Sequence, residues 1–318
     1  MTPRALIAGT GGYLPALVLD NDSLAARHGL DTSDAWIRER TGIRQRHIAA
    51  PGEMASDLAA AAARAALEQA GAEAAEVDGI IVATATPDAA FPSTAARVQA
   101  KLGVTRGFAF DLAAACTGFV YALSVADAMI RAGQARNVLV IGAEVFSRIL
   151  DWTDRTTCVL FGDGAGAVLL RASTEAEVGR GLLSCHLHAD GRFGDLLHLE
   201  GHPGVVRMNG REVFRHAVSK LASAVDEALQ ANGLSKGDVA WLVPHQANLR
   251  IIEAMGRKLD LPPERVVVAV DRHANTSAAS IPLALAEATR DGRIARGDLV
   301  LMEAIGGGLT WGAALARI

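Results

Sequence analysis

The strongest constraint in this 318-residue chain is an internal duplication. Residues 66–71 (ALEQAG) return as residues 228–233 (ALQANG), and the apolar run 79–82 (GIIV) returns as 240–243 (AWLV). In both cases the copies lie about 160 residues apart. A repeat of this size predicts two similar structural units and a single functional site at their junction, to which each unit contributes.

Short apolar runs alternate with longer Ala-rich segments along both copies. The predicted strands are residues 5–8, 79–83, 138–141, 165–170, 241–243, 266–270 and 299–301. The predicted helices are residues 55–70, 117–132, 212–232, 247–259 and 277–290. This alternation predicts an α/β architecture with mostly parallel sheets that helices cover on both faces. The polar stretch ASTEAE at 172–177 predicts a division into an N-terminal half, 1–172, and a C-terminal half, 173–318.

Charge and composition exclude several classes of protein. The net charge is −4 and no run of Lys or Arg resembles a nucleic-acid footprint, so we expect no nucleic-acid partner. No stretch of about 18 apolar residues could span a membrane, and no signal-peptide core is expected at the N-terminus. Cys116, Cys158 and Cys185 are too few and too scattered for a disulfide framework or a metal cluster. We therefore expect a reduced, cytoplasmic protein without a metal site.

Cys116 is the first candidate for chemistry, and it aligns with Asn275 when the two repeats are matched. It follows a strand-like segment and precedes the predicted helix 117–132. We expect its sulfur near a helix N-terminus, where backbone N–H groups and the helix dipole stabilise a thiolate that can attack a thioester. A buried, unreactive cysteine is the alternative at this position.

Polar groups occupy similar strand-to-helix corners in the second half. His245 follows a buried strand and Pro244, where α/β proteins place their ligands, although a helix-capping or solvent-facing His also fits. Asn275 precedes a predicted helix and could also be an ordinary N-cap. The glycines at 306–308 can bring backbone N–H donors close to a substrate, or they can form a tight turn.

Together these groups match what a condensation of two thioesters requires. A thiolate takes an acyl group from one thioester, and a second, malonyl-type thioester loses CO₂ to give an enolate. The N–H groups of a neutral imidazole and of an amide can stabilise the enolate oxygen. The backbone N–H groups of Cys116 and Gly308 can hold the tetrahedral oxyanion, and the loss of one such donor raises a barrier by about 3 kcal/mol.

Over nearly its whole length the chain resembles the β-ketoacyl-acyl-carrier-protein synthase III family of the thiolase-like superfamily. The motifs that carry this resemblance are TSDAWI at 32–37, RTGI at 40–43, AACTGF at 114–119, FGDGAG at 161–166, PHQAN at 244–248, ANTSAAS at 274–280 and GGGLTWG at 306–312. The resemblance implies a duplicated, five-layered α/β/α/β/α fold, a homodimer, and a catalytic set of Cys116, His245 and Asn275. It implies no cofactor, since the CoA thioester is a substrate.

The resemblance also implies an activity and binding roles. The activity is the condensation of a short acyl-CoA, most simply acetyl-CoA, with malonyl-acyl carrier protein at the start of fatty-acid synthesis. Trp36 and Arg155 match positions that sandwich the CoA adenine, and Arg40 matches one near the CoA phosphates. Phe91 matches a residue that closes the acyl pocket of the neighbouring subunit. Arg250 matches a basic residue where the acidic carrier protein docks.

Two features depart from the family pattern and leave the preferred primer open. Thr117 stands where relatives often have Ala, and the loop 198–208 is short. A starter condensing enzyme or acyltransferase of secondary metabolism therefore remains a rival, with the same three catalytic residues. A carrier-binding relative without activity is a third class, although the intact Cys, His and Asn argue against it.

Other enzyme classes fit less well. The GTGG motif at 9–12 follows the first predicted strand, as in dinucleotide-binding proteins, but it lacks the full spacing and the acidic residue about 20 positions on. A degradative thiolase is expected to have a second catalytic Cys near its C-terminus, whereas the last Cys here is Cys185. Elongating condensing enzymes have a second His where this chain has Asn275.

Overall fold

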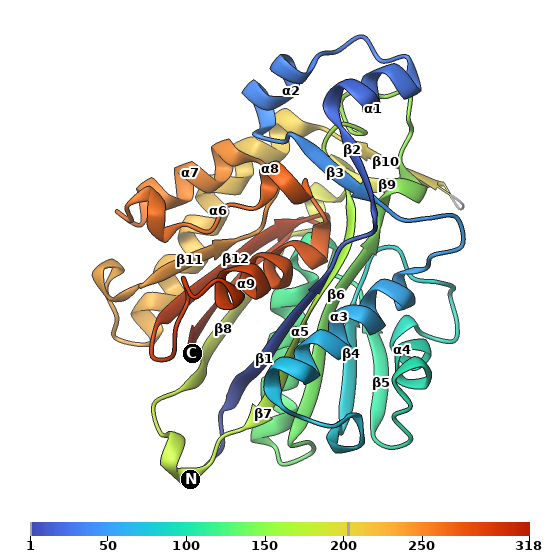
Figure 1. Ribbon diagram of the computed structural model, residues 1–318. Coiled ribbons are helices and arrows are strands. Elements are labelled where there is room, and N and C mark those ends of the chain that lie inside the picture. The colour runs from blue at the N-terminus through green and yellow to red at the C-terminus, as the bar shows by residue number, and fades with distance from the viewer. Residues whose placement is uncertain (1, 202–203) are drawn as a thin grey trace.

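Two sheets lie side by side in the molecule, and helices pack between them and on their outer faces (Figure 1). The structure is a computed structural model that describes residues 2–201 and 204–318. The first sheet has the order β1 (Ala5–Tyr13), β7 (Asp163–Ala172), β6 (Asn137–Val145), β4 (Gly79–Ala83), β5 (Phe108–Leu112). The second has the order β8 (Gly181–Ala189), β13 (Thr310–Arg317), β12 (Leu299–Gly306), β11 (Trp241–Pro244).

The two sheets repeat one topology, as the duplicated sequence predicts. In each sheet a single strand, β7 or β13, runs against the others, because its pairings are antiparallel while β4, β5 and β6, or β11 and β12, pair in parallel. The expected duplicated α/β fold with mostly parallel mixed sheets is therefore confirmed. The chain passes from one sheet to the other between Ala172 and Gly181. The half boundary at 172/173 stays a prediction.

The predicted strand at 266–270 is wrong. Only Val266 bridges to β11, through Leu242, at the position that β5 occupies beside β4 in the first sheet. The Gln246 side chain replaces a strand partner there: its Nε2 donates to the Val267 carbonyl (3.1 Å) and its Oε1 accepts from the Ala269 N–H (2.7 Å). The Val267 N–H donates to the Leu242 carbonyl of β11 (2.9 Å), whereas the Gln246 side chain bonds to the Val267 carbonyl and the Ala269 N–H, so pairing with β11 does not extend beyond this bridge.

The helices form three layers around the sheets. The layer between the sheets consists of α5 (Gly118–Arg131) and α9 (Ser280–Arg290), which pack on strands of both. The outer layer of the first sheet consists of α3 (Ala55–Ala70) and α4 (Thr94–Leu102). The outer layer of the second sheet is built on α6 (Gly210–Ala231), against which α7 (Leu249–Lys258) packs. These layers give the expected α/β/α/β/α arrangement.

Two small antiparallel strand pairs and two short helices lie beside the C-terminal ends of the central strands (Figure 1). The strand pairs are β2 (Leu17–Asp20) with β3 (Gln45–Ile48), and β9 (Leu197–Gly201) with β10 (Gly204–Met208). The helices α1 (Asn21–His28) and α2 (Asp34–Thr41) lie in the excursion between β2 and β3. Asp20 and Ser33 cap their N-termini by accepting backbone N–H groups. The sequence analysis predicts none of these four elements.

The GTGG motif at 9–12 has a packing function. A Cβ on Gly9 would lie 2.3 Å from the Ala66 carbonyl oxygen, and one on Gly11 would lie 2.2 Å from that of Ala62. The glycines thus allow α3 to lie directly on β1, together with the small side chains of the Ala-rich helix. This contact explains the motif without a nucleotide.

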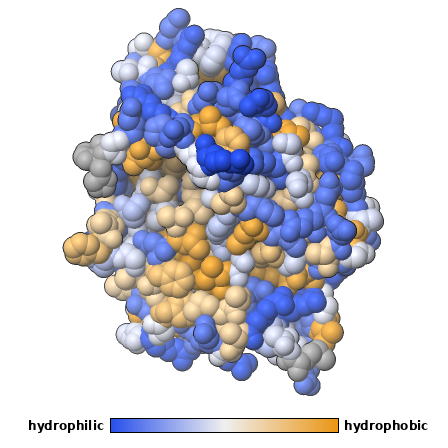
Figure 2. Space-filling view, turned by 180° about the vertical axis from the view of Figure 1, so that it is seen from behind, coloured by the Kyte–Doolittle hydropathy of each residue, from blue (hydrophilic) through white to orange (hydrophobic). Residues whose placement is uncertain are grey.

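The surface contains a broad apolar area on the face opposite to that of Figure 1 (Figure 2). Exposed large apolar side chains of the chain include Phe91, which is 85% exposed, and Val178. Within the described residues, no helix is long and apolar enough to cross a membrane.

Candidate active site

Cys116 lies in a single 3₁₀ turn, Ala115–Thr117, between β5 and α5. The preceding residue, Ala115, has a φ of 46°, in the left-handed region that non-glycine residues rarely adopt. Cys116 is buried, and Gly306 packs against it so closely that a Cβ there would lie 2.7 Å from the Cys116 backbone nitrogen. The turn therefore presents the sulfur at a helix N-terminus, as the sequence predicts, with the glycine turn directly behind it.

The expectation of a stabilised thiolate is wrong. Burial raises the pKa of the Cys116 thiol to about 12, and the nearby Glu144 raises it further, while the Ser277 hydroxyl lowers it. Loss of solvation outweighs the helix dipole because Cys116 is only 4% exposed. The thiol is consequently protonated at neutral pH.

Glu144 is a buried acid close to this thiol. Its carboxylate accepts hydrogen bonds from the Thr86 hydroxyl (2.6 Å) and the Ala85 N–H (3.1 Å), and burial raises its pKa to about 7. Within 2–201 and 204–318 the Ser277 hydroxyl has no well-aligned hydrogen-bond partner, although it lies near enough to lower the pKa of both Cys116 and Glu144. Glu144 thus lies beside the nucleophile with a pKa near neutrality.

His245 directly follows β11, where the strand ends at the junction of the halves. Its backbone N–H donates to the Glu303 carbonyl (2.8 Å), and its Nδ1 lies 2.6 Å from the Ser280 hydroxyl oxygen. Because that oxygen also accepts from the Gln246 N–H (3.3 Å), its own hydrogen is available to Nδ1, which favours the tautomer protonated at Nε2. Burial lowers the pKa of His245 to about 3, so the ring is neutral.

Asn275 follows the short helix α8 (Val270–His273) and is tied to the first half of the chain. Its backbone N–H donates to the Leu160 carbonyl (2.9 Å), and its carbonyl accepts from the Gly162 N–H (3.0 Å). Its side-chain Oδ1 accepts the Ser277 N–H (2.8 Å). Since the oxygen is engaged, the Asn275 amide presents its Nδ2 hydrogens as donors.

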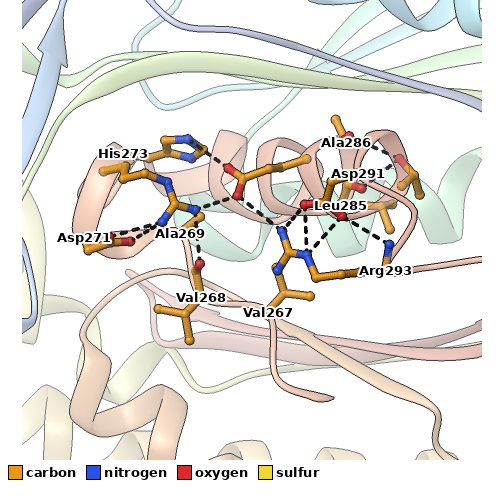
Figure 3. A network of polar contacts seen from close by, with 12 residues as sticks. Val267, Val268, Ala269, Asp271, His273, Leu285, Ala286, Asp291 and Arg293 are labelled. Carbon is orange, nitrogen blue, oxygen red and sulfur yellow. Dashed lines mark hydrogen bonds and ion pairs between the residues drawn. The ribbon is translucent and has the colours of Figure 1, made fainter. Parts of the chain in front are cut away.

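A polar network outside the cavity braces the two helices that flank Asn275 (Figure 3). Glu287 on α9 accepts from Arg272 on α8 (2.5 Å) and from Arg293 (3.2 Å). Arg272 also donates to the neighbouring Asp271 carboxylate (2.9 Å). His273 lies 3.5 Å from Glu287, and burial lowers its pKa to about 4. The network links the segments before and after Asn275, and so restrains the corner that holds its amide.

One cavity of about 580 Å³ brings the three residues together. Cys116, His245 and Asn275 all line it, and each is less than 10% exposed. The same cavity is lined by side chains of the other binding positions that the resemblance implies: Trp36, Arg40, Arg155 and Arg250. The arginines are exposed whereas the three catalytic candidates are buried, so the cavity has a basic mouth and a floor with a thiol, an imidazole and an amide.

An aromatic ring at this mouth has two cations close to it. The guanidinium carbon of Arg40 is 5.0 Å from the centre of the Trp36 ring, and that of Arg155 is 5.4 Å away. Arg155 also donates to the Asp31 carbonyl and lies 3.7 Å from the Asp31 carboxylate. This arrangement offers a flat, electron-rich surface together with two positive charges, which suits an aromatic group that carries phosphates.

A smaller cavity of about 90 Å³ opens beside Cys116. Its wall is mostly apolar and includes Phe146, Ile149 and Phe161. Gly307 lines this cavity, whereas Gly308 lines neither of the two. The assignment of Gly308 as an oxyanion donor stays a prediction, and the Gly307 N–H is a second candidate from the same turn.

Phe91 lies away from both cavities of its own chain. It stands on the exposed loop before α4 and lines neither cavity among the described residues. Its assignment to the pocket of a second subunit stays a prediction.

Several supporting residues do not emerge from the sequence. Ser277, Ser280 and Gln246 each bond to a candidate catalytic residue or its loop, and Glu144 lies beside the thiol. A buried acid within an otherwise apolar strand was the one available signal for Glu144. The serines lie within an ordinary helix-start pattern, which gives no sign of these contacts.

Family models of the 3-oxoacyl-[acyl-carrier-protein] synthase III family match this chain in two parts. The model of the family's C-terminal region matches residues 229–318, and that of the main region matches residues 110–191. A curated protein from Acidiphilium cryptum, named Beta-ketoacyl-[acyl-carrier-protein] synthase III, is 67% identical, and the alignment covers 99% of each chain. The chain belongs to the synthase III family.

Other synthase III proteins agree with this assignment. A protein of the same name from Granulibacter bethesdensis is 65% identical, with 99% of both chains covered. The crystal structure of the 3-oxoacyl-[acyl-carrier-protein] synthase III from Aquifex aeolicus matches with a TM-score of 0.94 at 48% identity, over 99% of this chain and 100% of that one. The synthase III fold therefore extends over the whole described molecule.

Proposed function

We propose that this chain condenses a short acyl-CoA, most simply acetyl-CoA, with malonyl-acyl carrier protein to give a 3-ketoacyl-carrier protein and CO₂. This is the reaction that starts fatty-acid synthesis. The observation that carries the proposal is the single cavity that has Cys116, His245 and Asn275 at its floor and Trp36 with Arg155 at its mouth.

The first half-reaction is acylation of Cys116. The sulfur attacks the thioester carbonyl, a new C–S bond forms to Cys116, the bond to the CoA sulfur breaks, and the thiol proton leaves with CoA as its free thiol. The backbone N–H of Cys116 and one N–H of the 306–308 turn would hold the oxyanion in the tetrahedral intermediate. Because the pKa of the buried thiol is about 12, proton transfer has to accompany the attack.

The second half-reaction is decarboxylation and condensation. The bond between the malonyl carboxylate and its α-carbon breaks, CO₂ leaves, and the electron pair forms an enolate. The Nε2–H of His245 and the Nδ2–H of Asn275 would donate to the enolate oxygen. The α-carbon then attacks the acyl-Cys carbonyl, the C–S bond breaks, and the Cys116 sulfur takes up one proton from solvent. A neutral imidazole suits this task, and burial lowers the pKa of His245 to about 3.

The exposed mouth would bind the CoA nucleotide. The adenine would stack on Trp36 in place of, or together with, the Arg155 guanidinium, which lies 5.4 Å from the ring centre. Arg40, whose guanidinium carbon lies 5.0 Å from the ring centre, would meet the phosphates. The small cavity beside Cys116 would hold the primer, and its volume of about 90 Å³, with Phe146 and Phe161 in its wall, supports a short acyl group.

Two protein partners are part of the proposal. Arg250, exposed at the first turn of α7, would contact the acidic carrier protein, while its own Nη2 donates to the Glu39 carbonyl (3.1 Å). A second copy of the chain would complete a homodimer, in which Phe91 covers the partner's acyl cavity. An aromatic side chain that is 85% exposed and the apolar face in Figure 2 support this contact. No cofactor is proposed, and a reducing, cytoplasmic compartment would keep the nucleophile a free thiol.

A starter condensing enzyme of secondary metabolism is the second candidate. The crystal structure of the priming β-ketosynthase from the R1128 polyketide pathway matches with a TM-score of 0.93, but its identity is 36%, against 67% for the fatty-acid relative. The small primer cavity also favours acetyl-CoA.

The test is a reconstituted condensation. The purified protein is incubated with malonyl-carrier protein and one of several acyl-CoA primers, and the carrier protein is analysed by mass spectrometry. We expect acetoacetyl-carrier protein and CO₂ from acetyl-CoA, at a higher rate than from primers of six or more carbons. Turnover only with long or aromatic primers would favour the second candidate. No condensation with any primer would refute both.

A further inference from the structure

Two threonine hydroxyls connect the nucleophile turn to the glycine turn behind it. The Thr117 hydroxyl donates to the Thr310 carbonyl (2.9 Å). The Thr310 hydroxyl lies 3.1 Å from the Thr117 hydroxyl oxygen, and 3.2 Å from both the Ala114 and the Gly307 carbonyl oxygens. This pair of side chains thus contacts the backbone before Cys116, at Ala114, and the backbone of the 306–308 turn, at Gly307.

We propose that Thr117 and Thr310 are positioning residues that hold the two backbone oxyanion donors, one in each turn, at a fixed separation. This inference rests on the proposed condensing function. It concerns how the protein holds the two backbone donors in place.

The peptide between Gly307 and Gly308 connects the Thr310 hydroxyl to a backbone oxyanion donor. The C=O of Gly307 and the N–H of Gly308 belong to one planar unit and point in opposite directions. A hydroxyl that holds the Gly307 oxygen therefore sets the direction of the Gly308 N–H, and it restrains the peptide next to the Gly307 N–H. Thr310 has one hydroxyl hydrogen, which the Gly307 and Ala114 oxygens share at equal distances of 3.2 Å. The Ala114 oxygen accepts the Thr117 N–H as well (3.1 Å), and this bond closes the Cys116 turn.

The glycine turn needs such a restraint from outside. Glycine has the widest choice of backbone conformations, and Gly308 has a φ of 135°, outside the range of ordinary L-residues. No side chain within 306–308 can anchor the turn. Preorganised donors stabilise a transition state because they need no reorientation during the reaction. A donor on an unrestrained glycine turn would lose part of that advantage.

The Thr117 side chain is fully buried, so an unpaired hydroxyl there would be energetically costly. The backbone hydrogen bond from the Thr117 N–H to the Ala114 carbonyl already closes the turn, so an alanine at position 117 would be sufficient for the turn itself. The hydroxyl bonds across to the Thr310 backbone of β13, so it links the first half of the chain to the second.

The test measures acylation of Cys116 in a single turnover with acetyl-CoA, for Thr117→Val, Thr310→Val and the matched serine variants. Valine keeps the shape and removes the hydroxyl, whereas serine keeps the hydroxyl. We expect each valine variant to acylate about 10-fold or more slowly, a part of the ~10²–10³ lost with a whole donor, and to keep its KM for acetyl-CoA. We expect serine to restore most of the rate, and the double valine variant to lose little more than one single variant.

Thr10→Val is the control, because it removes a second threonine pair, Thr10 with Thr289 (2.7 Å), that lies far along β1 and α9. It should lower the melting temperature and leave acylation unchanged. Valine variants at 117 and 310 that lose stability like this control but acylate at the wild-type rate would overturn the proposal, as would serine variants as slow as valine. If Thr310→Val does not fold, Thr117→Val and Thr117→Ser decide alone. Wild-type protein that takes up no acetyl group would refute the proposed function instead.

Discussion

The backbone oxygen of Glu303 accepts the His245 N–H at 2.8 Å, while the Glu303 carboxyl is buried with an oxygen that has no hydrogen-bond partner among the described residues. The strand residue that fixes the position of the imidazole therefore also places an unpaired acid inside the protein. Burial alone raises the pKa of the Glu303 carboxyl to about 8.

This raised pKa predicts a stability that falls as the pH rises. Between the unfolded value of about 4.5 and the folded value of about 8, folded Glu303 keeps a proton that the unfolded chain has released. Glu303→Gln removes this titration, so from pH 5 to pH 8 the variant should lose less stability than the wild type, by an amount of several kcal/mol. Burial also raises the pKa of Glu144, but this carboxyl is present in both the wild type and Glu303→Gln, so its contribution cancels in the comparison.

Urea unfolding at fixed protein concentration, at pH 5, 6.5 and 8, measures this difference. Parallel pH dependence of the wild type and Glu303→Gln would show that Glu303 is ionised in the folded protein, and the prediction would fail.

Asn275→Asp should separate the two half-reactions. The aspartate can still accept the Ser277 N–H, but it presents a second oxygen where Asn275 presents its Nδ2 donor. We expect acylation by acetyl-CoA to persist at a reduced rate, and decarboxylation of malonyl-carrier protein to fall by about 10²-fold or more. His245→Ala should behave in the same way. Release of CO₂ at the wild-type rate from either variant would contradict their assignment to the enolate.

Trp36→Ala and Arg155→Ala should weaken binding of the nucleotide part of CoA only. Each should raise the KM for acetyl-CoA by about 10-fold and leave kcat nearly unchanged, since the ring and guanidinium lie at the exposed mouth. Acetyl-pantetheine, which lacks the nucleotide, is the matched substrate, and its KM should not change. An equal rise in KM for both thioesters would place these side chains elsewhere in the binding path.

Gly11→Ala should destabilise the fold without touching the site. The new Cβ would lie 2.2 Å from the Ala62 carbonyl, so α3 would have to move away from β1 at a cost of about 1–3 kcal/mol. Gly237→Ala is the control, because its nearest neighbour would be 3.8 Å away. Thermal unfolding measures both.

The wild type should bind no NAD(P)H in a fluorescence titration, and saturable binding would revive the dinucleotide hypothesis.

Local sequence patterns predict most of the architecture. Apolar runs such as 79–83 and 138–141 coincide with buried strands, and the Ala-rich helix predicted at 55–70 is found at those residues, because buried strands and amphipathic helices have distinct periods. The matched repeats also place Cys116 and Asn275 at equivalent corners. The strand predicted at 266–270 fails because one distant side chain, Gln246, satisfies its backbone groups.

The electrostatics of the site could not be predicted in the same way. A helix N-terminus suggests a lowered pKa for the Cys116 thiol, but burial by residues distant in sequence, such as Gly306, raises it instead. Likewise, the Ser280 contact that orients His245 spans 35 positions. Local patterns carry no record of such contacts, whereas they do record the strands and helices that bring the groups together.

The most direct test of the account is intact-protein mass spectrometry after brief incubation with acetyl-CoA. We expect the wild type to gain one acetyl group, and peptide mapping to place it on Cys116. Cys116→Ala should gain none, while Cys158→Ala and Cys185→Ala should still gain one. Acetylation of Cys116→Ala at the wild-type rate, or a wild type that stays unmodified, would contradict the central claim that this sulfur carries the acyl group.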